Sequence, residues 1–244
     1  MVSVCMATYN GAKYLSDQIN SVLCQLDEMD ELIISDDGST DGTIEIITSY
    51  MDSRIKLYRN NAHCYTLNFE NALRHAHGDY VFLCDQDDIW KPNKMNTMLK
   101  YLQQYDFVVS DAEVVNQDLD VISLSRNTQF HIKNGFLRNL FKSYYLGCCM
   151  AFNRKVLDAV LPFPDDHELC KHDHWIALLS ELCFKTYVCD EVLMQYRRHG
   201  NNVSSGAIGI KSDIKTMIVR RSYMLKELLR RERIIRRKND EKNL

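Results

Sequence analysis

The chain has 244 residues, of which 45% are hydrophobic, 9 are glycine and 3 are proline. This composition excludes collagen-like, low-complexity and disordered chains, and the length allows one large domain or two small ones. Residues 1–210 carry 18 basic against 28 acidic side chains, whereas residues 211–244 carry 12 against 5, so the net charge of −3 conceals a strong asymmetry. We therefore expect the two parts to meet different partners.

The sequence contains no apolar run near the roughly 20 residues that a membrane-spanning helix needs. Residues 1–6 do not combine a basic region with a long apolar stretch, so no secretory leader is expected. The 9 cysteines lack C-x-x-C pairs and zinc-finger spacings, which predicts reduced, mostly buried thiols. These features predict a cytoplasmic protein that would meet a membrane only at its inner surface, as a peripheral protein.

Strands and helices alternate along the first part of the chain. Apolar runs predict buried strands at 2–7, 32–35, 55–58 and 80–84, and apolar residues at helical spacing predict helices at about 14–26, 44–51 and 69–77. This alternation predicts an α/β fold with a Rossmann-like, mostly parallel central sheet flanked by helices. Ligands of such a sheet bind at the carboxyl ends of its strands.

The pattern weakens in the second part. A helix at about 92–105 and a strand at 107–110 are followed by a polar, irregular segment at 116–146. Further on, the sequence predicts strands at 147–152, 186–189 and 192–196 and helices at 155–160 and 173–182. Because no linker is apparent, we expect one domain over 1–209. In residues 210–244, apolar residues recur at helical spacing and Arg and Lys lie between them, which predicts a basic amphipathic helical tail.

Two polar loops follow the first two predicted strands. In the first, Thr8, Tyr9 and Asn10 would place an aromatic ring for stacking on a nucleobase and backbone groups for a ribose, although a plain strand-to-helix turn also explains them. In the second, Asp37 would accept a hydrogen bond from a base N–H or a ribose hydroxyl. The alternative is an ordinary turn, in which Asp-Gly and Asp-Ser pairs are also common.

The loop after the fourth strand holds three carboxylates within four residues, Asp85, Asp87 and Asp88. Such groups repel one another unless a cation or a hydrogen-bond network compensates them. Mg²⁺ or Mn²⁺ prefers one or two carboxylates together with phosphate oxygens and water, so the loop predicts a metal bound to a diphosphate. The alternative is a solvated acidic turn.

Two later clusters complete the set. Asp173 lies among Lys171, His172 and His174 at the start of a predicted helix and would act as a general base toward an acceptor hydroxyl; the alternative is a capping Asp beside surface histidines. The segment 196–204 gathers Arg, His and small polar residues and would hold a phosphate, with His199 as its imidazole. Its alternative is a solvated loop.

Taken together, these clusters resemble the family 2 glycosyltransferases, which use nucleotide sugars and have the GT-A fold. The likeness covers about residues 2–205, and its N-terminal motifs are Met6–Gly11, Ser35–Thr43 and Gly78–Trp90. The segments Asn68–Glu70, Asp85–Trp90, His172–Trp175 and Tyr196–Asn202 further resemble a bacterial rhamnosyltransferase-like branch that builds surface polysaccharide. The resemblance implies a nucleotide-sugar half at about 1–110 and an acceptor half at about 111–209.

The resemblance also implies a role for each matching residue. The nucleotide site would comprise Thr8, Tyr9, Asn10, Asp37, Asn68, Asp85 and Asp87, with Tyr9 and Asp37 at the nucleobase and Asp85 or Asp87 at the ribose. Asn68 stands near the position of an Arg-Asn pair that many members carry. Asp87 and Asp88 would bind Mn²⁺ or Mg²⁺, His199 would contact the metal or the diphosphate, and Asp173 would be the base.

The function so implied is metal-dependent, inverting transfer of a sugar from dTDP-rhamnose or a UDP-sugar to a hydroxyl of a glycan or lipid-linked acceptor. The alternatives are a nucleotide-sugar-binding regulator without turnover and a metal-dependent nucleotidyltransferase, although no Gly-rich, Lys-bearing phosphate loop occurs near the N-terminus. No nucleic-acid partner is expected. Residues 211–244 would bind an anionic membrane surface, pack on the domain or mediate a homo-oligomer.

Overall fold

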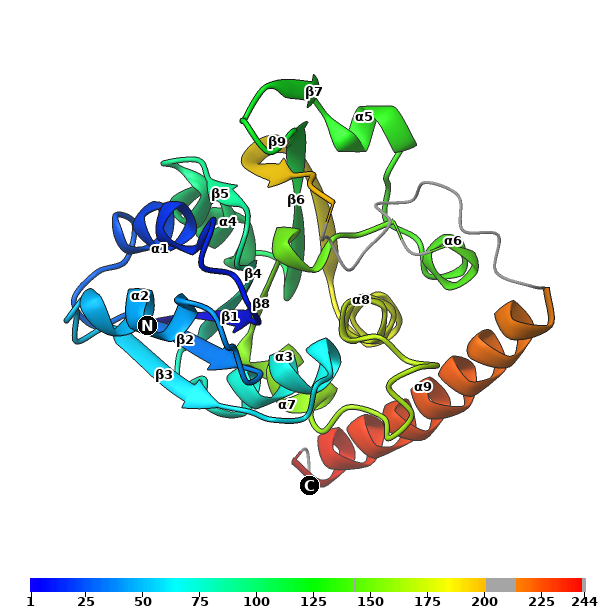
Figure 1. Ribbon diagram of the computed structural model, residues 1–244. Coiled ribbons are helices and arrows are strands. Elements are labelled where there is room, and N and C mark those ends of the chain that lie inside the picture. Colours follow the sequence, from blue (N-terminus) through cyan, green and yellow to red (C-terminus); the bar gives the residue numbers. More distant parts are fainter. Residues whose placement is uncertain (143, 201–213, 243–244) are drawn as a thin grey trace.

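The computed structural model describes residues 1–142, 144–200 and 214–242 (Figure 1). Within these residues one mixed sheet has the strand order β3-β2-β1-β4-β8-β6-β9-β5, and β7 pairs with β6 off this path. The strands are β1 (Val2–Thr8), β2 (Glu31–Asp36), β3 (Ile55–Arg59), β4 (Tyr80–Asp85), β5 (Ile89–Trp90), β6 (Phe107–Val115), β7 (Val121–Ser123), β8 (Met150–Asn153) and β9 (Thr186–Arg197).

Helices cover both faces of the sheet, with α1 and α4 on one side and α3 and α7 on the other (Figure 1). The helices are α1 (Leu15–Leu23), α2 (Thr43–Ser49), α3 (Tyr65–Arg74), α4 (Lys94–Leu102), α5 (Arg126–Phe130), α6 (Phe136–Phe141), the 3₁₀ turn η1 (Gly147–Cys149), α7 (Arg154–Val160), α8 (His172–Cys183) and α9 (Ile214–Lys242). The mixed α/β architecture predicted from the sequence is confirmed.

The predicted parallel arrangement holds in the first part of the sheet, where β3, β2, β1 and β4 run parallel. The register pairs Thr8 with Asp36 and Ala7 with Asp85, so the carboxyl ends of β1, β2 and β4 meet at one edge. In the second part β8 is antiparallel to both its neighbours, β4 and β6, while β9 is parallel to β6. Polar loop residues from three strands therefore gather at the same edge.

Three predicted strands differ from the structure. The strand expected at 147–152 starts only at Met150, because Gly147–Cys149 forms a 3₁₀ turn whose Cys148 carbonyl accepts a hydrogen bond (2.7 Å) from the buried Nζ of Lys94. The two strands expected at 186–189 and 192–196 form the single strand β9, and irregular register between Val109 and Glu113 of β6 accommodates the polar residues between them. The irregular segment 116–146 contains β7, α5 and α6.

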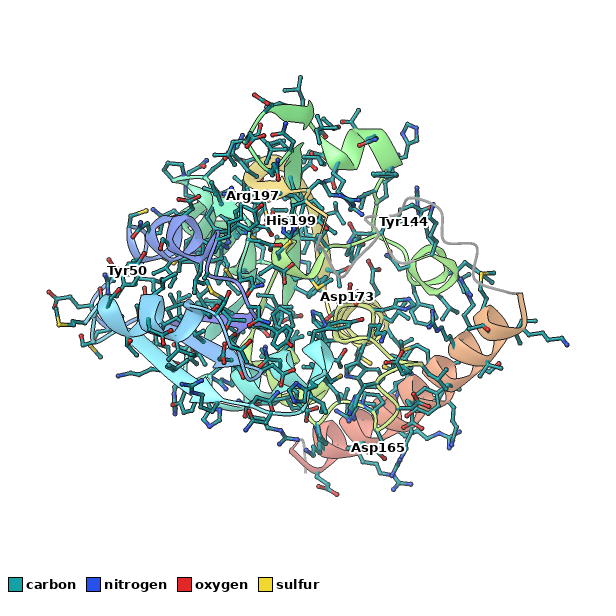
Figure 2. The ribbon with its side chains drawn as sticks, viewed as in Figure 1. Tyr50, Tyr144, Asp165, Asp173, Arg197 and His199 are labelled. Atoms are coloured by element: carbon teal, nitrogen blue, oxygen red, sulfur yellow. The ribbon has the colours of Figure 1, made fainter. Side chains whose placement is uncertain are left out.

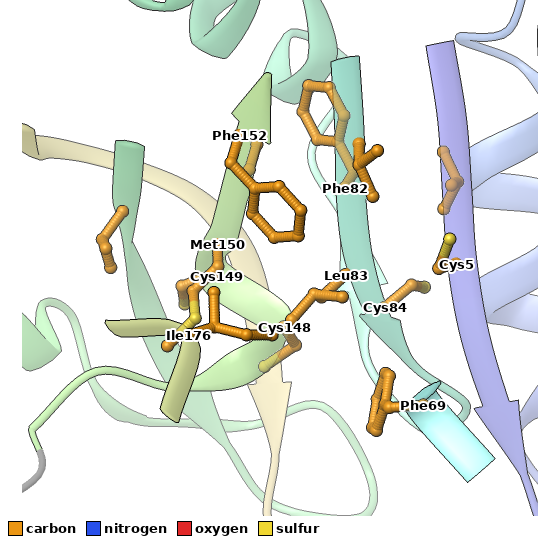
Figure 3. Packing of buried hydrophobic residues seen from close by; sticks show 14 of the residues in the cluster. Cys5, Phe69, Phe82, Leu83, Cys84, Cys148, Cys149, Met150, Phe152 and Ile176 are labelled. Atoms are coloured by element: carbon orange, nitrogen blue, oxygen red, sulfur yellow. The ribbon is translucent and has the colours of Figure 1, made fainter. Parts of the chain in front are cut away.

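The hydrophobic core lies directly beneath the polar edge. Figure 3 shows Phe82 of β4 and Phe152 of β8 close together, with Leu83 nearby, and all three side chains are fully buried. Cys148 and Cys149 of η1 join the same core and are also buried. Rigid packing of this kind fixes the strand ends and thus the loops that follow them.

The C-terminal segment forms the single helix α9, and residues 210–213 of the predicted tail lie outside the described residues. Met224 and Leu228 of α9 are fully buried, and the Arg231 guanidinium donates hydrogen bonds to the carbonyls of Ala159 (2.5 Å) and Leu161 (2.9 Å). This part of the apolar stripe therefore packs on the domain, as one of the sequence-based alternatives expected. Among the described helices, none is both long and apolar enough to cross a bilayer.

Because Leu228 is buried and its neighbour Leu229 is exposed, the two positions test the packing of α9 directly. We expect Leu228→Ala to lower the free energy of unfolding by about 2–5 kcal/mol, since it leaves a cavity between α9 and the domain. The control Leu229→Ala should change it by no more than about 0.5 kcal/mol. Urea unfolding of both variants measures the difference, and equal values would show that α9 does not pack as described.

Candidate active site

Two predicted site residues, Thr8 and Asn68, support the loop after β1 through buried hydrogen bonds. Thr8 Oγ1 donates a hydrogen bond to Asp36 Oδ2 (2.9 Å), and the Thr8 carbonyl accepts one from Asn68 Nδ2 (3.1 Å). Asn68 Oδ1 in turn accepts from Ser35 Oγ (2.6 Å). Both Thr8 and Asn68 are buried. The structure thus places them in the floor of the site, where they position the loop.

Tyr9 and Asn10 lie at the surface of this loop. The exposed Tyr9 ring stands edge-on to His63, with ring centroids 6.5 Å apart. Asn10 has a φ of 47°, in the left-handed region that Asn tolerates, and its Oδ1 accepts a hydrogen bond from Thr40 N (2.8 Å). Asn10 thus ties the loop that carries the exposed Tyr9 ring to the loop after β2.

Asp37 connects the loop after β2 to the segment before α3. Its two carboxylate oxygens accept hydrogen bonds from the backbone N–H groups of His63 (3.0 Å) and Cys64 (2.7 Å). Asp37 is buried, so its carboxylate acts here as a fixed anchor beside the Tyr9 ring. His63 was missed by sequence reasoning, because a single His in a polar loop carries no distinguishing pattern.

Gln86 joins the Tyr9 loop to the acidic loop. Its Oε1 accepts a hydrogen bond from Tyr9 N (2.9 Å) and its Nε2 donates one to the Tyr9 carbonyl (3.0 Å). Gly11 makes room for this contact, since a Cβ at Gly11 would lie 2.2 Å from Gln86 Oε1. The side chain between the acidic residues therefore fixes the distance between the two loops.

Asp85 and Asp88 point inward from the acidic loop. Ligand atoms of Asp85, Asp88 and Cys148 all lie within 4.8 Å of one another. Asp88 is fully buried; its Oδ1 accepts a hydrogen bond from Arg197 N (3.0 Å), while its Oδ2 has no hydrogen-bond partner among the described residues. Burial raises the pKa of Asp88, and burial followed by the charge of Asp87 raises the pKa of Asp85 to about 7.

Asp87 contacts residues at and after the end of β9. His199 Nε2 lies 2.7 Å from Asp87 Oδ2, and the His199 ring packs on Tyr14, with centroids 4.9 Å apart. Arg197 donates from Nε to the Asp87 carbonyl (2.9 Å) and lies over the Tyr14 ring. Two of the predicted metal ligands, Asp87 and His199, thus contact each other, and Tyr14 is a neighbour that the sequence did not indicate. Residues 201–204 of the predicted phosphate segment lie outside the described residues.

Asp173 lies in the first turn of α8 and is half-buried. A Cβ at Gly147 would lie 3.6 Å from the Cβ of Asp173, which shows how closely η1 approaches this residue. The charge of Asp173 is also one of the influences that raise the pKa of Asp85. In Figure 2, Asp173, Arg197 and His199 lie toward the centre of the molecule, whereas Tyr50 and Asp165 lie at its periphery.

The acidic loop fits a hard divalent cation. Its carboxylate oxygens are the ligands that Mg²⁺ and Mn²⁺ prefer, and the unpartnered Oδ2 of Asp88 is a buried acceptor that a cation would satisfy. Cys148 contributes differently, because a hydrogen bond with Cys149 and burial raise the pKa of its thiol. Cys148 therefore stays protonated, and its neutral thiol is a poor ligand for a hard cation.

The raised pKa of Asp85 predicts a pH effect in the absence of metal. Because the folded state holds this proton up to about pH 7 and the unfolded state releases it near its usual pKa of about 3.9, the contribution of Asp85 to stability is lost as the pH rises between these values. In the presence of EDTA, the Tm of the wild type minus that of Asp85→Asn should fall from pH 4.5 to pH 7.5. A constant difference would contradict the assignment.

Comparisons with known proteins identify the family of this chain. Residues 3–161 match the model of Glycosyl transferase family 2. The chain is 28% identical over 210 residues to the Escherichia coli UDP-Glc:alpha-D-GlcNAc-diphosphoundecaprenol beta-1,3-glucosyltransferase WfgD, covering 84% of this chain and 80% of WfgD. It is 30% identical over 223 residues to an uncharacterised glycosyltransferase of Haemophilus influenzae, covering 84% of this chain and 68% of the relative.

Solved structures of S. aureus TarS 1–349 share the fold. The complex with UDP-GlcNAc gives a TM-score of 0.65 at 18% identity over 94% of this chain and 72% of TarS 1–349. In the comparison with TarS 1–349 alone, at a TM-score of 0.64 and 20% identity, the aligned part covers 80% of this chain and 60% of that structure. The family match spans the Tyr9 loop, Asp37 and the acidic loop. The chain is therefore a member of glycosyl transferase family 2.

Proposed function

We propose that the protein is an inverting glycosyltransferase that moves a sugar from a pyrimidine nucleoside-diphosphate sugar, dTDP-rhamnose or a UDP-sugar, to a hydroxyl of a glycan or lipid-linked acceptor in bacterial surface polysaccharide synthesis. The observation that carries this proposal is the convergence of η1, Asp173 and the acidic loop at the sheet edge that also holds Tyr9 and Asp37. The name of WfgD, a UDP-Glc-dependent transferase with a lipid-linked acceptor, supports the donor and acceptor classes.

The nucleotide would lie along the carboxyl ends of β1, β2 and β4. Tyr9 would stack on the nucleobase, beside the segment that Asp37 anchors. Asp85 would face the ribose, and Asp87, Asp88 and His199 would hold Mn²⁺ or Mg²⁺ near the diphosphate. The contact between Asp87 and His199 and the unpartnered Oδ2 of Asp88 support this set. When bound, the cation would act as a Lewis acid toward charge that develops on the leaving diphosphate.

Asp173 would perform the proton transfer. Its half-buried carboxylate would accept the proton of the acceptor hydroxyl while that oxygen forms a bond to the anomeric carbon. The bond from this carbon to the diphosphate oxygen breaks at the same time, and its electron pair leaves with the nucleoside diphosphate. Attack from the opposite face inverts the anomeric configuration.

We further propose that residues 1–110 bind the nucleotide sugar and that residues 111–209 bind the acceptor. The acidic loop and the Tyr9 loop belong to the first part, and Asp173 and His199 to the second. The reaction would take place in the cytoplasm, at the inner face of the membrane where the acceptor is lipid-linked. Homo-oligomer formation remains a prediction.

Incubation with Mn²⁺ and a panel of nucleotide sugars tests the function. A transferase releases nucleoside diphosphate slowly even without acceptor, and dTDP-rhamnose and the UDP-sugars in the panel identify the donor. Conversion of a nucleotide sugar and added pyrophosphate into nucleoside triphosphate and sugar 1-phosphate would instead indicate a nucleotidyltransferase, and binding without turnover would indicate a regulatory protein. Either of the last two results would overturn the proposal.

A further inference from the structure

The short helix α6 turns large apolar side chains outward. Leu137 and Phe141 lie one turn apart on the same face and are 67% and 65% exposed. The other face of the helix is anchored, since Asn139 and Leu140 are buried. Exposed aromatic and aliphatic side chains that stand together on an otherwise packed helix mark a contact surface.

The first turns of α9 extend this face. Arg221 donates from Nε to the carbonyl of Leu140 (3.1 Å), and a second bond from its guanidinium reaches the carbonyl of Phe141. Ile218 lies one turn before Arg221 and is 59% exposed. Figure 1 places α6 beside the beginning of α9. We name Leu137, Phe141, Ile218 and the cations around them the α6–α9 surface.

All charged side chains in the sequence segments that form this surface are basic. Residues 121–157 contain no Asp or Glu, and neither do residues 214–226, although the whole chain carries a net charge of −3. The basic side chains are Lys133, Arg138 and Lys142 around α6 and Lys215, Arg220 and Arg221 on α9. Glu181 approaches α6 only from the inner side, where it accepts hydrogen bonds from Tyr145 Oη (2.5 Å) and Gly135 N (3.0 Å).

We infer that the α6–α9 surface lies on an anionic lipid bilayer. Apolar side chains surrounded by cations are what an interfacial membrane contact requires, and each Lys or Arg near an anionic surface strengthens the attraction. This inference rests in part on the proposed lipid-linked acceptor and names the partner surface. It also differs from insertion of the α9 apolar stripe, because Met224 and Leu228 are buried against the domain.

The surface is connected to the candidate base. The carbonyl of Asn139, on the inner face of α6, lies 2.9 Å from Nε2 of His174, the residue after Asp173. One helix therefore separates the proposed bilayer contact from the first turn of α8. An acceptor that stays attached to the bilayer would need to extend only around α6 to approach Asp173.

Vesicle flotation tests this inference with the full chain. The wild type should float with vesicles of equimolar phosphatidylcholine and phosphatidylglycerol, not with phosphatidylcholine alone, and less at high salt. The double variant Leu137→Gln/Phe141→Gln should bind anionic vesicles about tenfold more weakly or worse. The matched control Ile122→Gln/Leu124→Gln, at positions 62% and 75% exposed near Asp118 and Asp120, should bind like the wild type.

Other results would overturn the inference. Flotation that is unchanged in the α6 variant, or equally strong with phosphatidylcholine alone, would show that this surface does not dock on anionic lipid. If the wild type does not bind vesicles but self-associates, and the α6 variant does not self-associate, the surface binds a second copy of the chain instead. Release of nucleoside diphosphate without vesicles is measured in parallel. If nucleoside diphosphate is released but the protein does not float, only this inference is wrong. If the protein floats but releases no nucleoside diphosphate, only the proposed function is wrong.

Discussion

Asp173→Asn is expected to lower kcat for sugar transfer by about 10²–10⁴-fold, because the variant keeps the shape of the side chain and loses the base. The fold should persist, since the Oδ1 atom that accepts the backbone N–H of His174 (2.7 Å) is retained. KM for the nucleotide sugar should remain nearly unchanged, because the proposed nucleotide contacts lie on other loops. Steady-state kinetics with a saturating acceptor gives both values.

Asp165→Asn is the matched control for this prediction. Asp165 is exposed and lies at the periphery beside α9 in Figure 2, so its replacement should leave kcat unchanged. If Asp173→Asn turned over at the wild-type rate, Asp173 would not be the base and another group would have to accept the proton.

Asp88→Asn is expected to reduce metal-dependent release of nucleoside diphosphate about 100-fold or more without loss of folding stability. In the metal-free protein the Asp88 carboxylate is buried, and burial raises its pKa, so its charged form opposes folding. Asparagine keeps the acceptor for Arg197 N and removes that charge. Mn²⁺ at about 100 times its Kd should stabilise the wild type by about 2.7 kcal/mol and the variant hardly at all.

Asp111 provides the opposite case. It is also buried, but its carboxylate accepts hydrogen bonds from Ser125 Oγ (2.5 Å), Asn127 N (2.8 Å) and Ala112 N (2.7 Å). Asp111→Asn should therefore lose stability and keep the response of its Tm to Mn²⁺. A full Mn²⁺ response in Asp88→Asn would reject Asp88 as a metal ligand.

The sequence was most informative where a buried strand ends in a polar loop. Strands β1, β2 and β4 are largely buried and mostly apolar, and parallel pairing brings their ends to one edge, so the meeting of the Tyr9, Asp37 and acidic loops could be predicted. The 3₁₀ turn η1 could not, because it depends on the buried Lys94, whose role appears only in three dimensions.

The individual roles of the site residues were harder to predict. Thr8 and Asn68 are polar residues of the predicted nucleotide site, yet the structure buries both, at the end of β1 and within α3, where they support the backbone. The contact of Tyr14 with His199 joins segments far apart in the chain, and neither residue type indicates it. Residue identity therefore located the site, while burial and long-range contacts decide what each side chain does there.

The two hydrogen bonds of Gln86 to the backbone of Tyr9 have a consequence for specificity. They hold the Tyr9 loop and the acidic loop at a fixed distance, so a displacement of one loop also displaces the other. Substitutions at the proposed nucleobase contact should then alter the geometry of the proposed diphosphate site as well, and paired changes in the two loops should be non-additive. Donor preference in this chain would evolve by coordinated replacement of both loops.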